Sequence, residues 1–257
     1  MDLRLVSIDD RGPVRLLTIQ RPEVRNAMSQ ALMGEIADVL SQSEDAGLRV
    51  LVITGAGEAS FCSGGDLREF DGLRDRESTI AMSLRMQRLA RGLRRSPLIS
   101  IAALGGDAYG GGLEFALACD LRVAAEHVRL GFLQVTLGIT PAWRGVSRLR
   151  ELVGRSTALR LLLTGERFDA RTALVLGLVD RVAERGRAVD AALELAGAIV
   201  AHPAAAVRII KEMVDAPSSD DDTALAREAA MFAEAWLSKE HWAAVEAREA
   251  LRRNRAE

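Results

Sequence analysis

The sequence has very little lysine. Of its 34 basic residues only Lys211 and Lys239 are lysines, and 36 acidic residues bring the net charge to −2. Positive charge is therefore carried almost wholly by arginine, and no segment concentrates it as a nucleic-acid-binding surface does. This balance argues against nucleic acid as a partner.

Cysteine, histidine and long apolar runs are also scarce. The two cysteines, Cys62 and Cys119, have neither metal-site spacing nor a disulfide pattern, and the three histidines are scattered. No apolar run reaches the roughly 18 residues of a membrane span. The N-terminus lacks the basic and apolar regions of a signal peptide. We expect a reduced, cytoplasmic protein with no membrane span, no metal site and no separate cofactor.

Common nucleotide and hydrolase motifs are missing as well. Gly55 and Gly57 follow an apolar run, but Ser60 stands where a dinucleotide-binding motif needs its third glycine. A P-loop, an HExxH zinc helix and a GxSxG nucleophile elbow are absent. These absences exclude the most familiar nucleotide, zinc-protease and serine-hydrolase sites.

What is present favours an α/β fold. Short β-branched or leucine-rich runs alternate with longer helical patterns, which is typical of largely parallel sheets. The runs that predict strands are Val14–Ile19, Val50–Thr54, Leu98–Ala103, Leu121–Ala124 and Val179–Val182.

Two helices are predicted from spacing. Ser29 is a plausible N-cap for a helix whose apolar positions fall on one face, at Leu32, Ile36, Val39 and Leu40. A second helix is expected near 78–95, with arginines opposite a leucine face formed by Leu84, Leu89 and Leu93.

The composition changes after His202. We expect a core over residues 1–202 and a helical segment over 203–257, with a polar break at Pro217–Asp222 and a helix cap at Asp222 or Thr223. The last helix carries large apolar side chains, which need a core or another subunit to pack against: Phe232, Trp236, Leu237 and Trp242.

Two glycine-rich loops are the candidates for chemistry. One is Phe61–Leu67, after the run Val50–Thr54, and the other is Gly110–Asp120, after Leu98–Ala103. In each, a strand ends in glycines and a helix is expected to begin, so unpaired N–H groups and close ligand approach are available. Two such N–H groups on one oxygen form an oxyanion hole. The alternative is a pair of tight turns that use glycine for positive φ.

These segments, in this order and spacing, resemble the crotonase (enoyl-CoA hydratase/isomerase) superfamily. The resemblance lies in RPEVRNAMS (21–29), FCSGGDL (61–67), AYGGGLEFALACDLRVA (108–124), LGITPAWRG (137–145) and LTGERFDARTALVLGLVDRV (163–182). It covers most of the chain, and Pro203 followed by Lys211 extends it.

The resemblance implies a β/α spiral core with a C-terminal helical oligomerisation segment. The family forms homotrimers, often paired into hexamers, and binds acyl-CoA thioesters whose enolate is stabilised by two backbone N–H groups. By motif, those donors are Gly65 and Gly111. Arg25 and Ala27 match part of the CoA site. Ser63, Asp66 and Leu67 belong to the implied substrate-binding loop. Coenzyme A enters as part of the substrate, not as a cofactor.

The resemblance assigns one of the two catalytic glutamates of the hydratases, but the other is replaced. Glu114 matches the first of the two glutamates that hydratases use, and the balance of burial against a helix N-terminus suits it to proton transfer. A buried structural acid is the alternative. The second glutamate falls on Gln134, whose amide does not exchange a proton near neutral pH but can orient a water or substrate oxygen.

Other features resemble the alkylmalonyl-CoA decarboxylases of the superfamily. These are SPLIS (96–100), PAW (141–143) and a tail containing Trp236, His241 and Ala244. Decarboxylation needs the same enolate pocket but no base to remove an α-proton. Trp143 is interpreted either as a wall of the acyl pocket that selects short substrates or as core packing.

Three functional hypotheses therefore stand. The first is an enoyl-CoA hydratase-type lyase with Gly65, Gly111, Glu114 and Gln134 at its centre. The second is a decarboxylase of short alkylmalonyl-CoA thioesters. The third is a non-catalytic CoA-binding or scaffold protein, for example one that binds RNA, against which the balanced charge argues.

Overall fold

The computed structural model describes residues 4–216, 229–233 and 243 of the 257-residue chain. The chain separates into two compact units, Met1–Ala196 and Gly197–Glu257. The division falls within helix α7 (Ala188–Val200), ahead of the boundary expected after residue 202. The expected cap at 222–223 and the tail residues Trp236, Leu237, His241, Trp242 and Ala244 lie outside the described residues.

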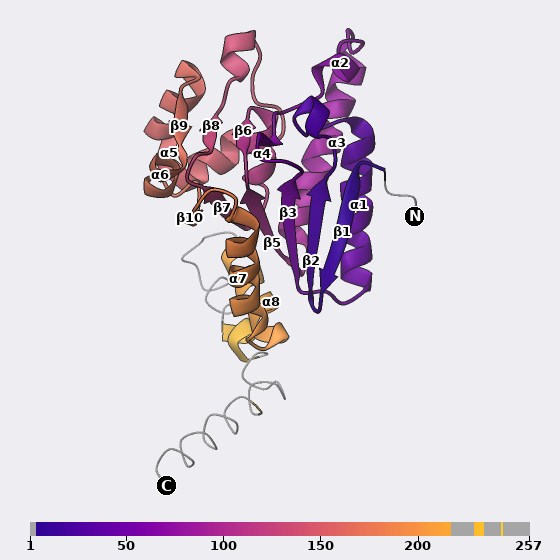
Figure 1. The fold of residues 1–257 in the computed structure, drawn as a ribbon, viewed down its shortest axis with the longest axis vertical. Coiled ribbons are helices and arrows are strands. Elements are labelled where there is room, and N and C mark those ends of the chain that lie inside the picture. Colours follow the sequence, from indigo (N-terminus) through magenta and orange to yellow (C-terminus); the bar gives the residue numbers. More distant parts are fainter. Residues whose placement is uncertain (1–3, 217–228, 234–242, 244–257) are drawn as a thin grey trace. The chain divides into compact units, whose positions relative to one another are not determined.

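The first unit is built around a six-stranded sheet (Figure 1). In spatial order its strands are β1 (Val6–Arg11), β2 (Val14–Ile19), β3 (Val50–Gly55), β5 (Ile99–Leu104), β7 (Leu121–Ala125) and β10 (Arg181–Ala183). Strands β1 and β2 form an antiparallel hairpin, and every later pair is parallel. The parallel pairing places successive loops at one end of the sheet, where α/β proteins commonly bind ligands.

All five predicted strands are present, with ends shifted by a residue or two. Strand β10 is the least accurate, because it begins at Arg181 and not at Val179. Strand β1 was not predicted, since only its first residue, Val6, is buried and the rest of VSIDDR faces solvent. A strand exposed in this way carries no apolar alternation for a sequence pattern to show.

A second, smaller sheet was also not predicted. It orders β4 (Ser60–Cys62), β6 (Asp107–Tyr109), β8 (Arg129–Gly131) and β9 (Arg167–Asp169), each three residues long. The glycine loops lie after the long strands, as expected, but do not follow them directly. Strands β4 and β6 intervene, and Phe61 and Cys62 belong to β4. Three residues are too few to establish a periodic pattern.

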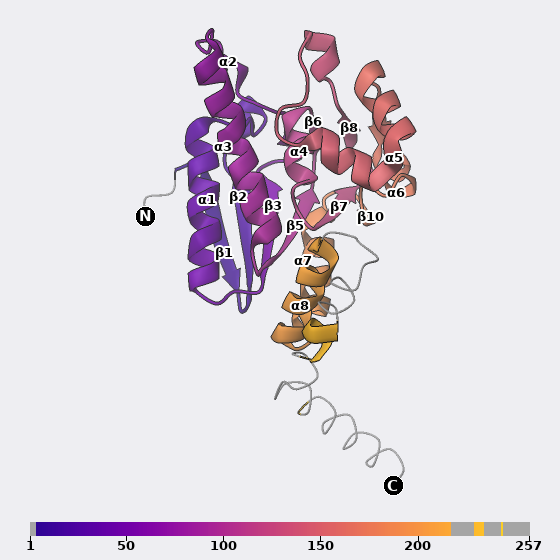
Figure 2. The ribbon, with the colours of Figure 1, turned by 180° about the vertical axis from the view of Figure 1, so that it is seen from behind.

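Two long helices lie side by side against one face of the large sheet. Helix α1 (Gln30–Asp45) begins where expected, because the Ser29 hydroxyl accepts a hydrogen bond from the Leu32 N–H at 3.1 Å. The predicted apolar positions of α1 are all buried. Helix α3 (Arg76–Arg95) lies next to α1. Both are behind strands β1–β3 in Figure 1 and in front of them in Figure 2.

One predicted core position in α3 is wrong. Leu89 and Leu93 are buried, but Leu84 is 41% exposed. Five residues separate Leu84 from Leu89, which rotates it by about 140° around a helix of 3.6 residues per turn. Met86 takes the buried position in its place.

Helix α5 (Gly145–Thr164) is long but is interrupted at Gly154, where φ is 72°. The other helical segments are η1 (Pro22–Val24), α2 (Leu67–Phe70), α4 (Gly111–Ala116), η2 (Gln134–Leu137), α6 (Ala170–Val175) and α8 (Ala204–Asp215). Within the described part of the chain, no single helix is long and apolar enough to cross a membrane. The bent pair α7 and α8 meets that test only when taken together, by length and composition.

Candidate active site

The two glycine loops meet at one end of the small sheet. Strands β4 and β6 pair in parallel, Ser60 opposite Asp107 and Cys62 opposite Ala108, so the loops that follow them leave at the same edge. A methyl group built on Gly64 would lie 3.5 Å from the backbone nitrogen of Gly111. Segments more than forty residues apart in the sequence are thus in contact.

Each of the two loops has a glycine with positive φ just before its candidate donor. Gly64 has φ of 116° and Gly110 has φ of 53°, and each precedes the glycine that the sequence singles out. The tight-turn and donor interpretations of the loops are therefore compatible. The positive-φ residue makes the turn, and the next residue, Gly65 or Gly111, presents its N–H.

The Gly65 N–H faces away from the segment around Met28 that lies beside it. Met28 pairs with Gly65 as a parallel bridge, in which the Met28 N–H donates to the Gly64 carbonyl at 2.8 Å and the Asp66 N–H donates to the Met28 carbonyl at 2.9 Å. In such a bridge the central residue directs its own N–H and C=O to the opposite side.

The Gly111 N–H is at the first position of α4, where no preceding turn supplies an acceptor. Among the residues that the structure describes, neither this N–H nor that of Gly65 donates a hydrogen bond. Two unpaired donors from adjacent loops are therefore available to an oxygen of a ligand.

Close packing explains why glycine occupies both donor positions. A methyl group on Gly111 would lie 2.2 Å from the Trp143 ring, and one on Gly65 would lie 2.7 Å from the Phe70 ring. The methyl position of Gly65 is also 3.5 Å from the Trp143 ring. The buried indole of Trp143 therefore covers the side of both glycines.

Glu114 lies one helical turn after Gly111 and is almost completely buried, with 2% exposure. Its Oε1 accepts hydrogen bonds from the backbone N–H groups of Trp143 and Gly145, both at 2.8 Å. Its Oε2 accepts from the Gln134 amide nitrogen at 2.9 Å. Burial raises the pKa of Glu114 above its ordinary value, opposed by these hydrogen bonds.

Gln134 occupies the position beside Glu114 that the sequence analysis gave it. It lies at the start of η2, is 8% exposed, and stacks its amide near Gly110, whose methyl position would be 3.7 Å from the amide carbon. Its Oε1 is buried, and no described residue donates a hydrogen bond to it. The Gln134 amide therefore brings one unpaired acceptor to the buried Glu114 carboxylate.

The loop that carries Trp143 is fixed by α3. The Ala142 carbonyl accepts hydrogen bonds from the Ser83 hydroxyl at 2.7 Å and from the Gln87 amide at 3.0 Å. Sequence reasoning missed Ser83 and Gln87, because nothing local distinguishes them from other polar residues on a helix.

The Arg25–Ala27 loop is fixed by Asn26, which sequence reasoning also passed over. Arg25 and Asn26 both have positive φ. The fully buried Asn26 side chain accepts from the Arg21 N–H at 3.1 Å and donates to the carbonyls of Ala56 at 3.0 Å and Ser60 at 2.7 Å. Two consecutive positive-φ residues, one of them asparagine, are visible only in the structure.

The same loop is tied to the first glycine loop. The Arg21 guanidinium donates to the Ala27 carbonyl at 2.5 Å and to the Asp66 carboxylate at 2.8 Å, and the Ser63 N–H donates to the Arg25 carbonyl at 3.1 Å. The hydrogen bond from Arg21 lowers the pKa of Asp66.

Asp66 and Leu67 form the start of α2. The Asp66 carboxylate caps the helix by accepting from the Glu69 N–H at 3.4 Å, and Leu67 is 62% exposed at the first helical position. The residues expected to bind substrate therefore surround the two donor glycines from three elements of the chain.

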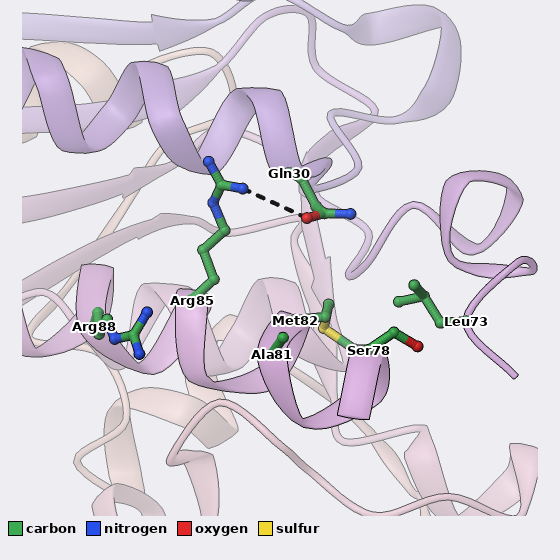
Figure 3. A pocket seen from close by; sticks show the side chains of 7 residues that line it. All are labelled: Gln30, Leu73, Ser78, Ala81, Met82, Arg85 and Arg88. Carbon is green, nitrogen blue, oxygen red and sulfur yellow. Dashed lines mark hydrogen bonds between the residues drawn. The ribbon is translucent and has the colours of Figure 1, made fainter. Parts of the chain in front are cut away.

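A separate groove of about 530 Å³ lies between α1 and α3 (Figure 3). It is lined by Gln30, Leu73, Ser78, Ala81, Met82, Arg85 and Arg88. The Arg85 guanidinium donates to the side-chain oxygen of Gln30 at 3.5 Å. None of the donor glycines or acid residues lines this groove. Within the described segments, no three His, Cys, Asp or Glu side chains converge as metal ligands.

Comparison with known proteins identifies the family. The family model described as "Enoyl-CoA hydratase/isomerase" matches residues 10–251, nearly the whole chain. The chain belongs to this family, within the crotonase superfamily. As a family member it acts on acyl-CoA thioesters.

Individual relatives agree with this assignment. The short-chain-enoyl-CoA hydratase of Clostridium acetobutylicum is 36% identical over 245 residues, covering 93% of this chain and 92% of that protein. The ethylmalonyl-CoA decarboxylase of Rattus norvegicus is 34% identical over 205 residues, covering 78% and 68%. The crystal structure of enoyl-CoA hydratase from Bacillus anthracis superimposes with a TM-score of 0.91 at 33% identity, covering 96% of each chain. The crotonase-like fold is therefore confirmed.

Proposed function

We propose that the protein is a lyase that hydrates short 2-enoyl-CoA thioesters, with Gly65 and Gly111 as oxyanion donors and Glu114 as acid and base. The observation that carries this proposal is the placement of Glu114 one helical turn after Gly111, with two unpaired N–H groups on adjacent loops. A thioester oxygen held by those donors would lie near Glu114, which accepts hydrogen bonds from Gln134 and from the Trp143 backbone.

The donors stabilise the charge that develops on the thioester oxygen. When water adds to the β-carbon of an enoyl thioester, the electron pair of the double bond moves through the α-carbon to that oxygen and forms an enolate. An N–H group aimed at such an oxygen in a dry site commonly contributes about 3–4 kcal/mol to lowering the barrier. Packing by Trp143 and Phe70 excludes water from the side of both glycines.

Glu114 transfers the proton in both halves of the reaction. As the water oxygen bonds to the β-carbon, one O–H bond of water breaks and its proton passes to Glu114 Oε2. The enolate then collapses, and the α-carbon takes that proton back from Oε2. Burial raises the pKa of Glu114 towards the working range, which suits a group that must accept and return a proton.

Gln134 orients the water in place of a second acid. Its Oε1 has a free acceptor position and lies on the amide that contacts Glu114. A water that donates one hydrogen to Glu114 and the other to Gln134 would be aligned for attack. Because an amide does not take up the proton, all proton transfer falls to Glu114.

Trp143 sets the size of the acyl group. Its indole packs across Gly65 and Gly111 and is held by the hydrogen bonds of the adjoining backbone to Glu114 and α3. Space next to the reacting carbons is therefore restricted, which favours short and compact acyl chains.

A second candidate function is decarboxylation of a short alkylmalonyl-CoA thioester. It is favoured by Gln134 in place of an acid and by the likeness to the rat ethylmalonyl-CoA decarboxylase. Here the bond from the α-carbon to the carboxylate breaks, CO₂ leaves, and the electron pair forms the same enolate. Protonation of the α-carbon by Glu114 or water then completes the reaction, so one acid suffices.

The experiment is a comparison of substrates and of matched variants. Crotonyl-CoA and ethylmalonyl-CoA are incubated with wild type, Glu114→Gln and the control Glu151→Gln, which alters an exposed glutamate of α5. Hydration of crotonyl-CoA that falls at least 100-fold in Glu114→Gln alone is expected. Undiminished hydration would exclude the role of Glu114, and CO₂ release without crotonyl-CoA turnover would establish the decarboxylase.

Two further parts of the proposal concern binding and assembly. We expect micromolar to millimolar binding of acetyl-CoA by calorimetry, and no measurable binding would favour a scaffold protein. Activity should persist after dialysis against a chelator, because no step requires a metal. Light scattering should give the mass of a trimer or hexamer, because residues 203–257 match the C-terminal segment through which family members associate.

A further inference from the structure

The hydrogen bonds around Glu114 leave one place for a proton. Its Oε1 already accepts two backbone N–H groups at 2.8 Å, from Trp143 and Gly145. Both donors are fixed in the backbone and cannot reverse. A proton on Oε1 would confront both of them, so Glu114 must carry its proton on Oε2.

Oε2 in turn faces a donor. The Gln134 nitrogen, Nε2, donates to Oε2 at 2.9 Å, an arrangement that matches an ionised carboxylate. When Oε2 is protonated and its hydrogen points along this contact, the hydroxyl and the amide N–H₂ become two donors directed at one another. That conflict disappears if the amide turns by 180° and presents Oε1.

The surroundings of Gln134 permit this rotation. Its Oε1 has no hydrogen bond to any described residue, so turning breaks no second contact. The two ends of a carboxamide are nearly equal in size. The methyl position of Gly110 lies beside the amide at ordinary van der Waals distance from both of its ends, so Gly110 favours neither orientation.

We propose that Gln134 is a positioning residue whose amide reverses with the protonation state of Glu114. Beside ionised Glu114 it presents an acceptor to the substrate side, and beside protonated Glu114 it presents a donor. This inference deepens the proposed function and rests on the role of Glu114 as the proton carrier.

The reversal would follow the course of the reaction. Before addition, Oε1 accepts a hydrogen bond from the attacking water. After Glu114 has taken the water proton onto Oε2, the turned amide accepts from Oε2 and directs Nε2 at the newly formed hydroxyl oxygen. One amide would therefore serve both stages, a change of polarity that a fixed second carboxylate cannot make without exchanging a proton.

The thiol, phenol and guanidinium groups on the packed elements do not titrate together with Glu114. The Cys62 thiol of β4 has a pKa of about 11, and burial raises the pKa of the Tyr109 phenol of β6, so both stay neutral. Arginines remain charged throughout. The remaining charged groups on these elements and around the ends of α5 are Asp107, Arg129, Arg144, Arg148, Arg150, Glu151, Arg155, Arg160 and Glu166.

The test is a pH titration of glutamine side chains by NMR without substrate. The chain has five glutamines, and the Gln134 signal is assigned by its loss in Gln134→Leu. We expect its ¹⁵N–H₂ pair to shift through one inflection that is absent in Glu114→Gln. In that variant the signal should stay at the acid limit of wild type, because the new amide nitrogen mimics the protonated oxygen.

Gln20 is the internal control. Its amide donates to the exposed Ser7 hydroxyl, which does not ionise, so its signal should not follow the Glu114 inflection. A Gln134 signal that does not shift, or that shifts equally in Glu114→Gln, would overturn the proposal. If Gln134→Leu fails to fold, the Gln134 signal is assigned in wild type by its through-space NMR contacts with Gly110, which lies against the amide.

Kinetics provide a second measurement that separates positioning from structure. Gln134→Leu should lower kcat about 10- to 100-fold with little change in KM, the effect of losing a hydrogen bond to a charged group. Gln134→Glu should recover part of kcat and add a second inflection to its pH profile. A normal NMR titration without hydration activity would refute the proposed function alone, whereas full activity in Gln134→Leu would refute the switch.

Discussion

Gly111→Ala tests whether Trp143 packs directly on the oxyanion loop. The new methyl group would lie 2.2 Å from the indole, against about 3.5–4.0 Å for an ordinary carbon–carbon contact. The ring would have to retreat by more than about 1 Å. The ring is held in place because the backbone N–H of Trp143 donates to Glu114, and the Ala142 carbonyl accepts hydrogen bonds from Ser83 and Gln87.

The expected loss of stability follows from these contacts. Overpacking a buried site costs about 1–3 kcal/mol, and replacing a helical glycine by alanine returns about 0.5–1 kcal/mol. We therefore expect Gly111→Ala to lower the free energy of unfolding by about 0.5–2 kcal/mol. Trp143→Leu should cost about 2–4 kcal/mol by itself, because a large buried side chain is shortened.

The decisive measurement is the double-mutant cycle from urea unfolding. In Gly111→Ala/Trp143→Leu the methyl group occupies space that the ring has left, so the double variant should be more stable than additivity predicts by about 0.5–2 kcal/mol. Gly105→Ala is the matched control, since a methyl group there meets nothing within 4 Å. Strict additivity, with Gly111→Ala as stable as the control, would show that the indole does not lie on this loop.

Three further predictions concern the supporting residues. Asn26→Ala should lower the free energy of unfolding by about 2–4 kcal/mol in denaturant titrations, because one buried carbonyl, one partly buried carbonyl and one N–H lose their partner. A loss below about 0.5 kcal/mol, less than one unpaired buried group usually costs, would contradict this. The hydrogen bond from Arg21 lowers the pKa of Asp66, so its stabilisation is present at neutral pH and is lost as the pH falls through the folded-state pKa. Asp66→Asn should therefore show a smaller fall in urea midpoint between neutral and acid pH than wild type, and an equal fall would refute the pair's role. Cys62, buried with a pKa of about 11, should react with a thiol reagent only as fast as the protein opens, and rapid labelling of the native protein would contradict its burial.

Local patterns account for the parts of the fold that were predicted correctly. The buried strands β2, β3, β5 and β7 are short runs rich in aliphatic residues. Ser29 caps α1 by accepting from the N–H of Leu32, only three residues later. The parts that failed are those without a local signal. Strand β1 is mostly exposed, and the strands of the small sheet have three residues each. Leu84, five residues before Leu89, points about 140° away from the buried face of its helix.

The candidate site divides in the same way. The glycine loops, Glu114 and the replacement of its partner by Gln134 can be read from the sequence alone, because each is a residue type at a fixed position in a motif. The contacts of these residues depend on the folded chain. The meeting of the two loops, the Trp143 indole over both glycines, and the three donors to Glu114 all join segments from different parts of the chain. Distances between such segments depend on how strands pair and helices pack, which no local pattern of residues specifies.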